Sequence, residues 1–535
     1  MSEYLNTMMA FQMYQNEKKR PYFVDKTRLL TELFPLVEQG TSYICITRPR
    51  RFGKTVMANM VSAFFGKGCH SNGLFDDLSI AGQKGYSENL NQHNVIQIDF
   101  SVVDDECSSY KEYIGTIKEL LREDLHNAYS HIAFRKNGSV REDLNRIYSS
   151  TNERFLFVLD EWDAVFHMPF MTEENKKSYL LFLKGLLKDK AYVSLVYMTG
   201  ILPIAKYSSG SELNMFAEYS MGTEEKFSDY FGFTEAEVDA LYQRYLVNVQ
   251  EWKVTREELK EWYDGYHTKS GERLYNPRSI VLSLTNNNLG NYWTSSGPYD
   301  EIFYYIKHNV DDVRNDLALM VSGIPVKSGI REYAASSMEL STREEIFSAM
   351  VVYGFLSYED GMVRIPNKEL MDKFDEMIKK ESSLGYMNQL AKESSRMLKA
   401  TMTGDTDTMT EILEYAHNTE TPILNYNNEV ELSAIVNLVY LSARESYRIE
   451  REDKAGIGYV DFIFYPNKKN EDCIILELKV NHTPEEAIQQ IKDKKYALRF
   501  AGKLGEPSPY TGRILAVGIS YFKETKEHQC KIEVL

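Results

Sequence analysis

The chain has 535 residues, of which 43% are hydrophobic and 26% charged, a composition that excludes an intrinsically disordered protein. Its formal net charge of -16 excludes a generally basic surface, so any contact with nucleic acid needs a local basic patch. The length predicts about three to four domains.

Cellular location is indicated by the cysteines and the apolar segments. The five cysteines are widely spaced and form no zinc-type pair, which favours a reducing compartment over a disulfide framework. The first twenty residues carry Glu3 and no continuous apolar stretch, so we expect no secretory signal. The longest apolar run, residues 192–204, is too short to cross a bilayer. We therefore expect a cytoplasmic protein with no membrane partner.

A Gly-Lys-Thr sequence follows the first strand-like run. Residues 42–47 are β-rich, residues 46–55 read ITRPRRFGKT, and residues 56–68 have helical periodicity. Strand, loop and helix in this order are typical of a phosphate-binding loop, in which backbone N–H groups and the helix N-terminus surround phosphate oxygens. The expected nucleotide-binding residues are Arg51, Phe52, Gly53, Lys54, Thr55 and Val56. Lys54 would reach the β- and γ-phosphates of ATP, and the Thr55 hydroxyl would hold Mg²⁺.

The opening glycine of such loops is absent, and Arg48 occupies its position. A surface loop that contains Gly-Lys-Thr by chance is therefore the alternative, and a second motif must decide. It lies in residues 154–163, RFLFVLDEWD, where a continuous apolar run is typical of a parallel strand buried on both faces. At its tip, Asp160 would hold the water shell of Mg²⁺ and Glu161 would polarise the attacking water. Solvated acids that cap a strand are the alternative.

Two more strand candidates lie at residues 94–101 and 191–200. Strands that alternate with helices predict an α/β doubly wound sheet with ligands at the carboxyl ends of the strands. Thr199, at the tip of the last strand, would sense the γ-phosphate, unless this strand simply leaves into a loop. Arg50 and Arg51 would contact phosphates or a neighbouring subunit of a homo-oligomer, or else be solvated loop charges.

These motifs, together with YFVDKTRLL, LFVLDEWDAVF and MTGIL, resemble the bacterial AAA-ATPase-like family. The loop of that family typically reads Arg-Pro-Arg-Arg-Phe-Gly-Lys-Ser/Thr, so Arg48 is similar to the family norm. The resemblance continues through FSDYFGFTEAEV, WYDGYH and LYNPRSIVLSL and covers most of residues 15–300. Trp162 departs from the more frequent Tyr, with no expected consequence. The resemblance implies that ATP is bound and hydrolysed.

Residues 227–420 show mostly helical periodicity and predict a lid and connector. Thr234 and Thr255 are the expected N-caps of two helices. Asp264, His267 and Arg278 are expected to fix a turn or cap a helix. Contact of Arg278 with phosphate, as a lid arginine, is the alternative.

The last third contains two strand-like runs, residues 459–466 and 472–480, that predict a hairpin. Glu477 and Lys479 are two residues apart and so share one face of a strand, while Asp461 lies in the partner strand. Asp461 and Glu477 would share a divalent ion with Lys479 beside the attacking water, as phosphodiester cleavage requires. A surface hairpin with a Glu–Lys pair is the alternative.

Helices are expected on both sides of this hairpin, one from near Glu429 and one capped by Thr483. This order of elements is similar to the PD-(D/E)XK nuclease superfamily. The site residues that the resemblance implies are Asp461, Glu477 and Lys479 as the core, Glu429 as an acidic residue from the first helix that joins the metal ligands, and Gln490 from the following helix. Val460 precedes Asp461 where the motif usually has proline, a variation that the superfamily allows. Lysines 492, 494 and 495 would bind DNA phosphates or form a solvated helix face.

The sequence therefore predicts an α/β fold with a P-loop NTPase parallel sheet, a helical middle region and a C-terminal α/β nuclease-like domain with a mixed sheet. The expected domains are residues 1–225, 226–420 and 421–535. The leading hypothesis is an ATP-regulated, Mg²⁺-dependent DNA nuclease in bacterial defence or mobile-element control, with Mn²⁺ as an alternative metal at the nuclease site. The other hypotheses are a nucleotide switch whose nuclease-like domain only binds nucleic acid or a protein, and a chaperone-like remodelling ATPase.

Overall fold

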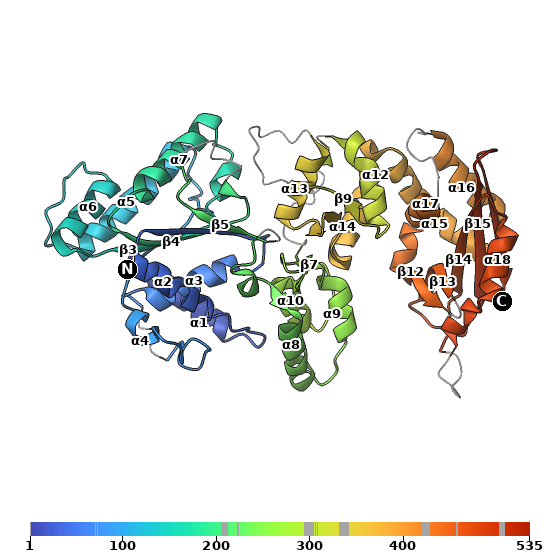
Figure 1. The fold of residues 1–535 in the computed structure, drawn as a ribbon, viewed down its shortest axis with the longest axis horizontal. Coiled ribbons are helices and arrows are strands. Elements are labelled where there is room, and N and C mark those ends of the chain that lie inside the picture. Colours follow the sequence, from blue (N-terminus) through green and yellow to red (C-terminus); the bar gives the residue numbers. More distant parts are fainter. Residues whose placement is uncertain are drawn as a thin grey trace.

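The computed structural model describes residues 2–69, 71, 73–204, 212–221, 224–293, 304, 306–307, 309–330, 342–419, 429–455, 458–501 and 509–535. Figure 1 shows an elongated molecule in which an N-terminal unit, a middle region and a C-terminal unit follow one another along the longest axis. The two chain ends lie in the two outer units. None of the described helices is long and apolar enough to cross a bilayer.

A five-stranded parallel sheet forms the centre of the N-terminal unit, with strand order β2-β3-β4-β1-β5. Its strands are β1 Ser42–Thr47, β2 Asn94–Asp99, β3 Phe155–Asp160, β4 Val193–Gly200 and β5 Ala217–Ser220. β3 and β4 are buried along their whole length, as their continuous apolar runs predict. The four predicted strands are confirmed, and their carboxyl ends meet at one edge of the sheet, where Asp160 ends β3.

Helices cover both faces of this sheet because neighbouring residues of a strand point to opposite sides. Leu156 and Val158 pack against α1–α3, whereas Phe157 and Leu159 pack against α5–α7 on the other face (Figure 1). The helices are α1 Met8–Lys18, α2 Leu29–Gln39, α3 Lys54–Phe65, α4 Tyr86–Asn89, α5 Tyr110–Ala128, α6 Val140–Thr151 and α7 Glu173–Leu187, with the 3₁₀ helix η1 at Ala164–His167.

The middle region consists of two parts, which we name the lid and the connector. The lid contains α8 Glu235–Asn248, α9 Arg256–Tyr263, α10 Pro277–Asn286 and a sheet of β6 Phe233–Thr234, β8 Arg273–Tyr275 and β7 Tyr266–His267. The connector contains α12 Val310–Val321, α13 Arg343–Tyr353, α14 Lys368–Lys380, α15 Tyr386–Thr403 and a sheet of β10 Ser357–Glu359, β11 Met362–Arg364 and β9 Val326–Lys327. Thr234 and Thr255 are N-caps with full capping boxes, as predicted. The two small sheets were not predicted, because strands of two or three residues show no alternation.

The C-terminal unit is a mixed sheet of order β12-β13-β14-β15-β16, in which only β14 and β15 are parallel. Its elements are α16 Thr406–Thr419, α17 Glu429–Val439, η6 Leu441–Glu445, β12 Tyr447–Ala455, β13 Gly458–Pro466, β14 Cys473–Val480, α18 Pro484–Asp493, η7 Tyr496–Phe500, β15 Ile514–Phe522 and β16 Glu527–Val534. The predicted hairpin and its flanking helices are confirmed, and Thr483 caps α18 in a capping box. β12 was not predicted, because its sequence YRIEREDKA is too polar to indicate a strand.

One apolar core extends from the phosphate-binding loop to the C-terminal sheet. It includes Phe52 of the loop, Tyr266 of the lid, Phe347 of the connector and Leu476 of β14. The ring of Phe52 contacts that of Tyr266 edge-on, with centroids 5.0 Å apart. Apolar packing is therefore continuous from the loop to the distant sheet.

Gly265 lies where the lid meets the connector, and there is no space for a side chain at this position. Its φ is +108°, and an added Cβ would lie 1.9 Å from the carbonyl oxygen of Pro366. We expect Gly265→Ala to lower the free energy of unfolding by about 2–5 kcal/mol, because strain and overlap add. The matched control is Gly271→Ala, with a φ of +84° and no atom nearer than 4.0 Å. Calorimetric melting should rank the two variants in that order, and equal melting temperatures would contradict the close approach.

Candidate active sites

The phosphate-binding loop closes around the ammonium group of Lys54. This buried group donates hydrogen bonds to the carbonyl oxygens of Arg48 and Pro49, both at 3.2 Å, and lies 3.7 Å from Glu161. Gly53 precedes α3 with a φ of +91°, and an added Cβ there would meet no atom within 4 Å. The glycine is therefore required by the backbone conformation and not by crowding. The N-terminus of α3 faces the loop, which is the arrangement that binds phosphate.

Asp160 lies at the carboxyl end of β3. One of its carboxylate oxygens accepts hydrogen bonds, and the other has no hydrogen-bond partner. Oδ1 accepts hydrogen bonds from the hydroxyl of Thr199 and, at 3.1 Å, from the backbone N–H group of Glu161, and the Thr55 hydroxyl lies near enough to act on the pKa of the carboxylate. Oδ2 is buried without a hydrogen-bond partner. Burial, together with the charge of Glu161, raises the pKa of Asp160 to about 6. A buried oxygen without a partner beside the Thr55 hydroxyl fits a hard cation such as Mg²⁺.

A cavity of about 450 Å³ opens between the loop and the lid. Its lining includes the loop residues 50–57 and Glu161, and its apolar wall includes Tyr22, Phe23, Val24, Phe233 and Val281. The volume suits a small organic ligand. The motif YFVDKTRLL contributes the first three of these wall residues, and its sequence alone did not predict that they belong to the site.

Arg51 and Arg278 are two of the four arginines that line the same cavity. Arg51 donates a hydrogen bond to the carbonyl oxygen of Tyr292 at 2.9 Å, and burial together with the nearby charge of Arg278 lowers the pKa of Arg51. Arg278 lies in the first turn of α10 and lines the cavity from the side of the lid. Two like charges beside a cavity favour an anionic ligand that would relieve their repulsion. The alternative role for Arg278, contact with phosphate, is thus sterically available.

The other residues predicted to bind nucleotide differ in their surroundings. Val56 lines the cavity, and the ring of Phe52 belongs to the apolar core while its carbonyl oxygen accepts from the Gly232 N–H group. Thr199 is buried and contacts Asp160. Sequence reasoning missed Asp163, a buried carboxylate that accepts from the N–H groups of residues 201 and 202, and whose pKa is raised to about 6 by burial.

Arg48 takes a structural position in place of the missing glycine. Its buried guanidinium donates to the carbonyl oxygens of Thr47 and Tyr219, both at 2.8 Å, and lies over the ring of Phe231. Burial lowers the pKa of Arg48 to about 10. The side chain therefore points away from the phosphate site and ties the loop to the edge strand β5.

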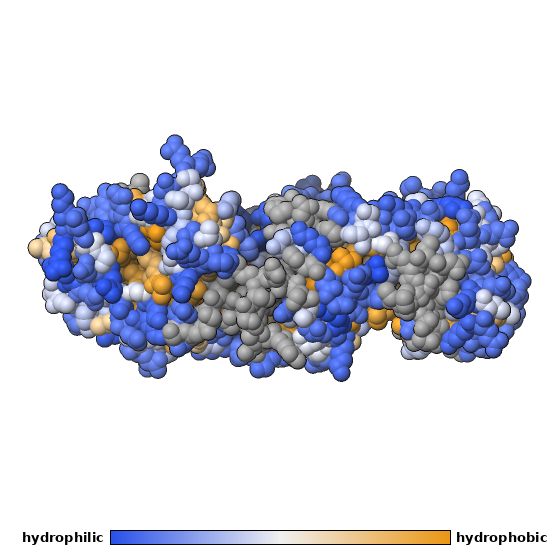
Figure 2. Space-filling view, turned by 90° about the horizontal axis from the view of Figure 1, so that it is seen from above, coloured by the Kyte–Doolittle hydropathy of each residue, from blue (hydrophilic) through white to orange (hydrophobic). Residues whose placement is uncertain are grey.

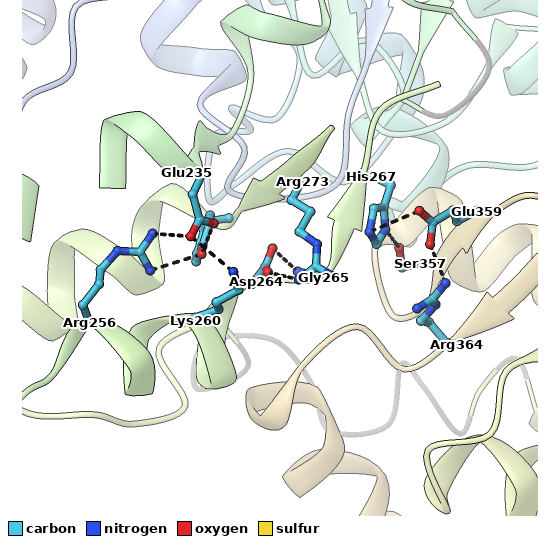
Figure 3. A network of polar contacts seen from close by, with 11 residues as sticks. Glu235, Arg256, Lys260, Asp264, Gly265, His267, Arg273, Ser357, Glu359 and Arg364 are labelled. Atoms are coloured by element: carbon cyan, nitrogen blue, oxygen red, sulfur yellow. Dashed lines mark hydrogen bonds and ion pairs between the residues drawn. The ribbon is translucent and has the colours of Figure 1, made fainter. Parts of the chain in front are cut away.

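The WYDGYH segment fixes the joint between lid and connector (Figure 3). Asp264 follows α9 and accepts from the Gly265 N–H group at 2.6 Å and from Arg273 at 2.9 Å. His267 reaches into the connector, where its ring nitrogens lie 3.2 Å from the Ser357 hydroxyl and 3.7 Å from Glu359. Asp264 and His267 thus have the structural role that the sequence predicts.

The C-terminal site lies where two strands separate. The ladder between β13 and β14 pairs Phe462 with Leu476 and does not continue to Asp461. Instead, the Asp461 carboxylate accepts a hydrogen bond from the backbone N–H group of Leu478 at 2.7 Å. Beyond the Phe462–Leu476 pair, the side chain of Asp461 and not its backbone connects the two strands.

The side chain of Glu477 is buried, with 3% of the residue exposed, and only one of its two carboxylate oxygens accepts hydrogen bonds. Its Oε1 accepts hydrogen bonds from Lys479 Nζ at 3.3 Å and from the side-chain amide of Gln490. Its Oε2 is buried without a hydrogen-bond partner. Burial and the charge of Asp461 raise the pKa of Glu477 to about 8, although Lys479 opposes the shift. The available oxygen, beside a second carboxylate, fits a divalent cation.

Glu429 and Tyr496 complete the surroundings of this site. The carboxylate of Glu429 lies 3.9 Å from Lys479 Nζ. In the part of the chain that the structure describes, no three His, Cys, Asp or Glu side chains are close enough to hold a metal together. The role of Glu429 as a metal ligand therefore stays a prediction. Tyr496 belongs to the core, and its hydroxyl donates to the carbonyl oxygen of Tyr459.

The fold and the two sites define a protein with a P-loop nucleotide site and a two-carboxylate, one-lysine site in a mixed sheet. Residues 8–209 match the model of the AAA-ATPase-like family, described as predicted AAA-ATPase. Residues 431–526 match a model of the PD-(D/E)XK nuclease superfamily. The chain therefore combines an AAA-ATPase-like domain with a PD-(D/E)XK nuclease superfamily domain.

Two solved structures are distantly similar. A Walker-type ATPase of Pyrococcus abyssi shares 12% identity at a TM-score of 0.37, over 65% of this chain and 94% of its own. The ORC2 protein of Aeropyrum pernix, solved in ADPNP and ADP complexes, shares 12% identity at a TM-score of 0.34, over 65% of this chain and 93% of its own. No curated protein matches the sequence.

The raised pKa of Glu477 predicts a pH dependence of metal binding. Near neutral pH the metal-free protein holds a proton on Glu477 that a cation must displace. Mn²⁺ affinity should therefore rise as the pH increases toward about 8, by up to about tenfold per pH unit. The stability of the metal-free protein should fall over the same range, because the unfolded chain loses this proton more readily. Calorimetric titration at several pH values measures the first effect, and Glu477→Gln should abolish it.

Proposed function

We propose that the protein is an ATP-regulated, Mg²⁺-dependent DNA nuclease. The observation that carries this proposal is the buried Oε2 atom of Glu477, which has no hydrogen-bond partner although Asp461 and Lys479 lie beside it. A structural Glu–Lys pair would satisfy both carboxylate oxygens, since buried polar groups in folded proteins are rarely left without a partner. A cation-binding nuclease site explains the exception.

The nuclease reaction assigns a task to each residue. A divalent cation, when bound, neutralises the scissile phosphate and lowers the pKa of a bound water. Asp461 and Glu477 would hold this cation, and Gln490 orients Glu477 through its amide. Lys479, 3.3 Å from Glu477, would steady the attacking water and the developing negative charge.

The nucleotide site supports ATP as the regulator. Lys54 and the N-terminus of α3 would bind the phosphates, while Thr55 and Asp160 would hold Mg²⁺. Glu161 would polarise the attacking water, and its carboxylate lies at the cavity beside Lys54. We assign Arg51 and Arg278 to the phosphates as well, because they come from opposite sides of the cavity, the loop and the lid.

Contacts of the loop support coupling between the two sites. The indole N–H group of Trp293 donates to the carbonyl oxygen of Arg50 at 3.0 Å. Glu369 of the connector accepts from the Trp293 N–H group and, at 2.7 Å, from the Ser279 hydroxyl of the lid. The connector core continues into the C-terminal sheet. If these contacts can take two arrangements, a nucleotide that binds one of them more tightly favours that arrangement. It thereby shifts the population of nuclease conformations.

The remaining assignments of the proposal follow the sequence. We assign the ATPase domain to residues 1–225, the lid and connector to 226–420 and the nuclease domain to 421–535. The proposal includes a cytoplasmic location, homo-oligomers and a role in bacterial defence or mobile-element control. These points rest on the two-part architecture and the sparse cysteines.

Cleavage assays test the proposal directly. Purified full-length protein is incubated with linear, circular and single-stranded DNA and with RNA, in Mg²⁺ or Mn²⁺, with and without ATP. We expect metal-dependent cleavage of DNA that ATP alters, and no cleavage in EDTA. Binding of DNA without cleavage in any metal would favour a nucleotide-dependent switch instead. ATP turnover that a protein stimulates, without cleavage of any nucleic acid, would favour a remodelling ATPase.

A further inference from the structure

A groove of about 1110 Å³ lies between α5, α6 and α7, on the sheet face opposite to α3. Its apolar lining includes Phe134, Leu181, Phe182 and Leu186, and Leu181 is 49% exposed. Figure 2 shows apolar surface bordered by hydrophilic residues at this end of the molecule, where Figure 1 places α5 and α7. Neither the nucleotide site nor the nuclease site uses this surface.

The charges around the groove are opposite to those of the chain as a whole. Five Lys and Arg side chains line it against two Glu, although the chain carries a net charge of -16. Two of these cations are compensated, since Arg122 pairs with Asp143 at 2.7 Å and Arg135 with Glu142 at 3.5 Å.

The other three cations form no ion pair with the described part of the chain. Among those residues, Lys118, Lys136 and Arg141 have no carboxylate within 4.0 Å, although Glu119 and Glu123 line the same groove and the charge of Arg141 acts on Glu142. The ammonium group of Lys118 lies 4.9 Å from the centre of the Phe182 ring, directly beside the apolar floor. These cations are available to carboxylates from another molecule, and the excess of positive over negative charge in the lining attracts a partner of the opposite sign.

Two glycines keep the middle of the groove open. Gly115 lies within α5 and Gly185 within α7, and both line the groove. A Cβ added to either residue would meet no atom within 4 Å, so no internal contact requires a glycine. Glycine within a helix costs about 0.5–1 kcal/mol relative to alanine. A close approach by a second molecule accounts for this cost at both positions.

We propose that this groove binds an acidic amphipathic helix of a partner protein. The apolar face of such a helix would cover Leu181 and Phe182, its backbone would pass over the two glycines, and its carboxylates would reach the three uncompensated cations. Amphipathic helices bind apolar grooves in this manner. Nucleic acid fits less well, because its phosphates would lie against the apolar floor. Since α7 follows the Glu161 segment in the chain, an occupant would contact the ATPase domain next to its catalytic strand.

A defined probe tests the inference. We would use a fluorescein-labelled synthetic helix with leucine on one face and glutamate on the other, and measure its binding to the full-length protein by fluorescence anisotropy. Gly185→Trp should fill the groove and weaken binding by about tenfold or more, whereas the matched variant Gly185→Ala should weaken binding far less. Lys118→Glu and Arg141→Glu should each weaken binding by about tenfold, and added salt should weaken binding to the wild type.

Controls establish that the peptide binds at the groove and nowhere else on the chain. An unchanged melting temperature of Gly185→Trp would show that the variant is folded, so its loss of binding would support the groove. The inference is overturned if the peptide does not bind, if it binds Gly185→Trp unchanged, or if a lysine-for-glutamate version binds equally well. It is also overturned if an oligonucleotide displaces the peptide with higher affinity, or if sedimentation shows that a second copy of the chain occupies the groove. None of these outcomes depends on nuclease activity, so they are distinguishable from a failure of the proposed function.

Discussion

Replacing Lys54 by alanine is expected to lower ATP hydrolysis by about a hundredfold or more, because preorganised cations stabilise the charge of the transferring phosphoryl group. The ammonium group is buried and is held by two loop carbonyl oxygens and Glu161, so the variant also leaves Glu161 without its cation. Phosphate release from ATP measures the rate, and a fluorescent ATP analogue measures binding.

The matched control for this prediction is Lys67→Ala, which removes an exposed lysine of the same domain that pairs with Glu153 at 3.2 Å. An exposed ion pair contributes about 0–1 kcal/mol to stability, so this variant should hydrolyse ATP at the wild-type rate. Wild-type hydrolysis by Lys54→Ala would refute the assignment of the phosphate-binding loop.

Replacing Lys479 by alanine is expected to reduce DNA cleavage by about a hundredfold or more, because the variant removes a charge beside the developing negative charge of the reaction. Glu477→Gln should have an equally large effect, since it removes one of the two carboxylates that would hold the cation. Gel assays with linear DNA measure both. Neither substitution should change the rate of ATP hydrolysis in the absence of DNA, because both residues lie in the C-terminal sheet.

The control for the nuclease variants is Lys468→Ala in the turn between β13 and β14, where the exposed lysine pairs with Glu471 at 3.4 Å. It removes the same charge from the same domain without touching the site, so cleavage should change little. If Lys479→Ala cleaves DNA as the wild type does, our assignment of the site is wrong. Loss of cleavage in Lys54→Ala as well would support coupling between the two halves.

Much of the fold could be predicted because its central strands are unusually apolar. Residues 155–159 form an unbroken apolar run, which is typical of a strand buried on both faces. The first half of β14 is likewise apolar and buried. Elements without this signal were missed. β5 is four residues long and only partly buried, and the lid strands are shorter still. Their positions depend on tertiary contacts that a local pattern does not contain.

The sites were predictable where residue type and strand position together determine the outcome. Glu161, directly after β3, meets Lys54, directly after the loop of β1, because the carboxyl ends of parallel strands share one edge. Residues whose partners come from distant segments could not be assigned in this way. The hydroxyl of Thr199 bonds to Asp160, and Asp163 holds the backbone after β4; neither contact follows from sequence spacing.

The anchoring of Arg48 bears on where this protein can be divided. The family match ends at residue 209, whereas the carbonyl oxygen that receives the guanidinium belongs to Tyr219 and the ring beneath it to Phe231. A fragment cut at the match would lack both partners and the edge strand β5, and it would expose the apolar side chains that these segments cover. The smallest ATPase fragment that folds on its own must therefore extend beyond residue 209, where the match to the family model ends.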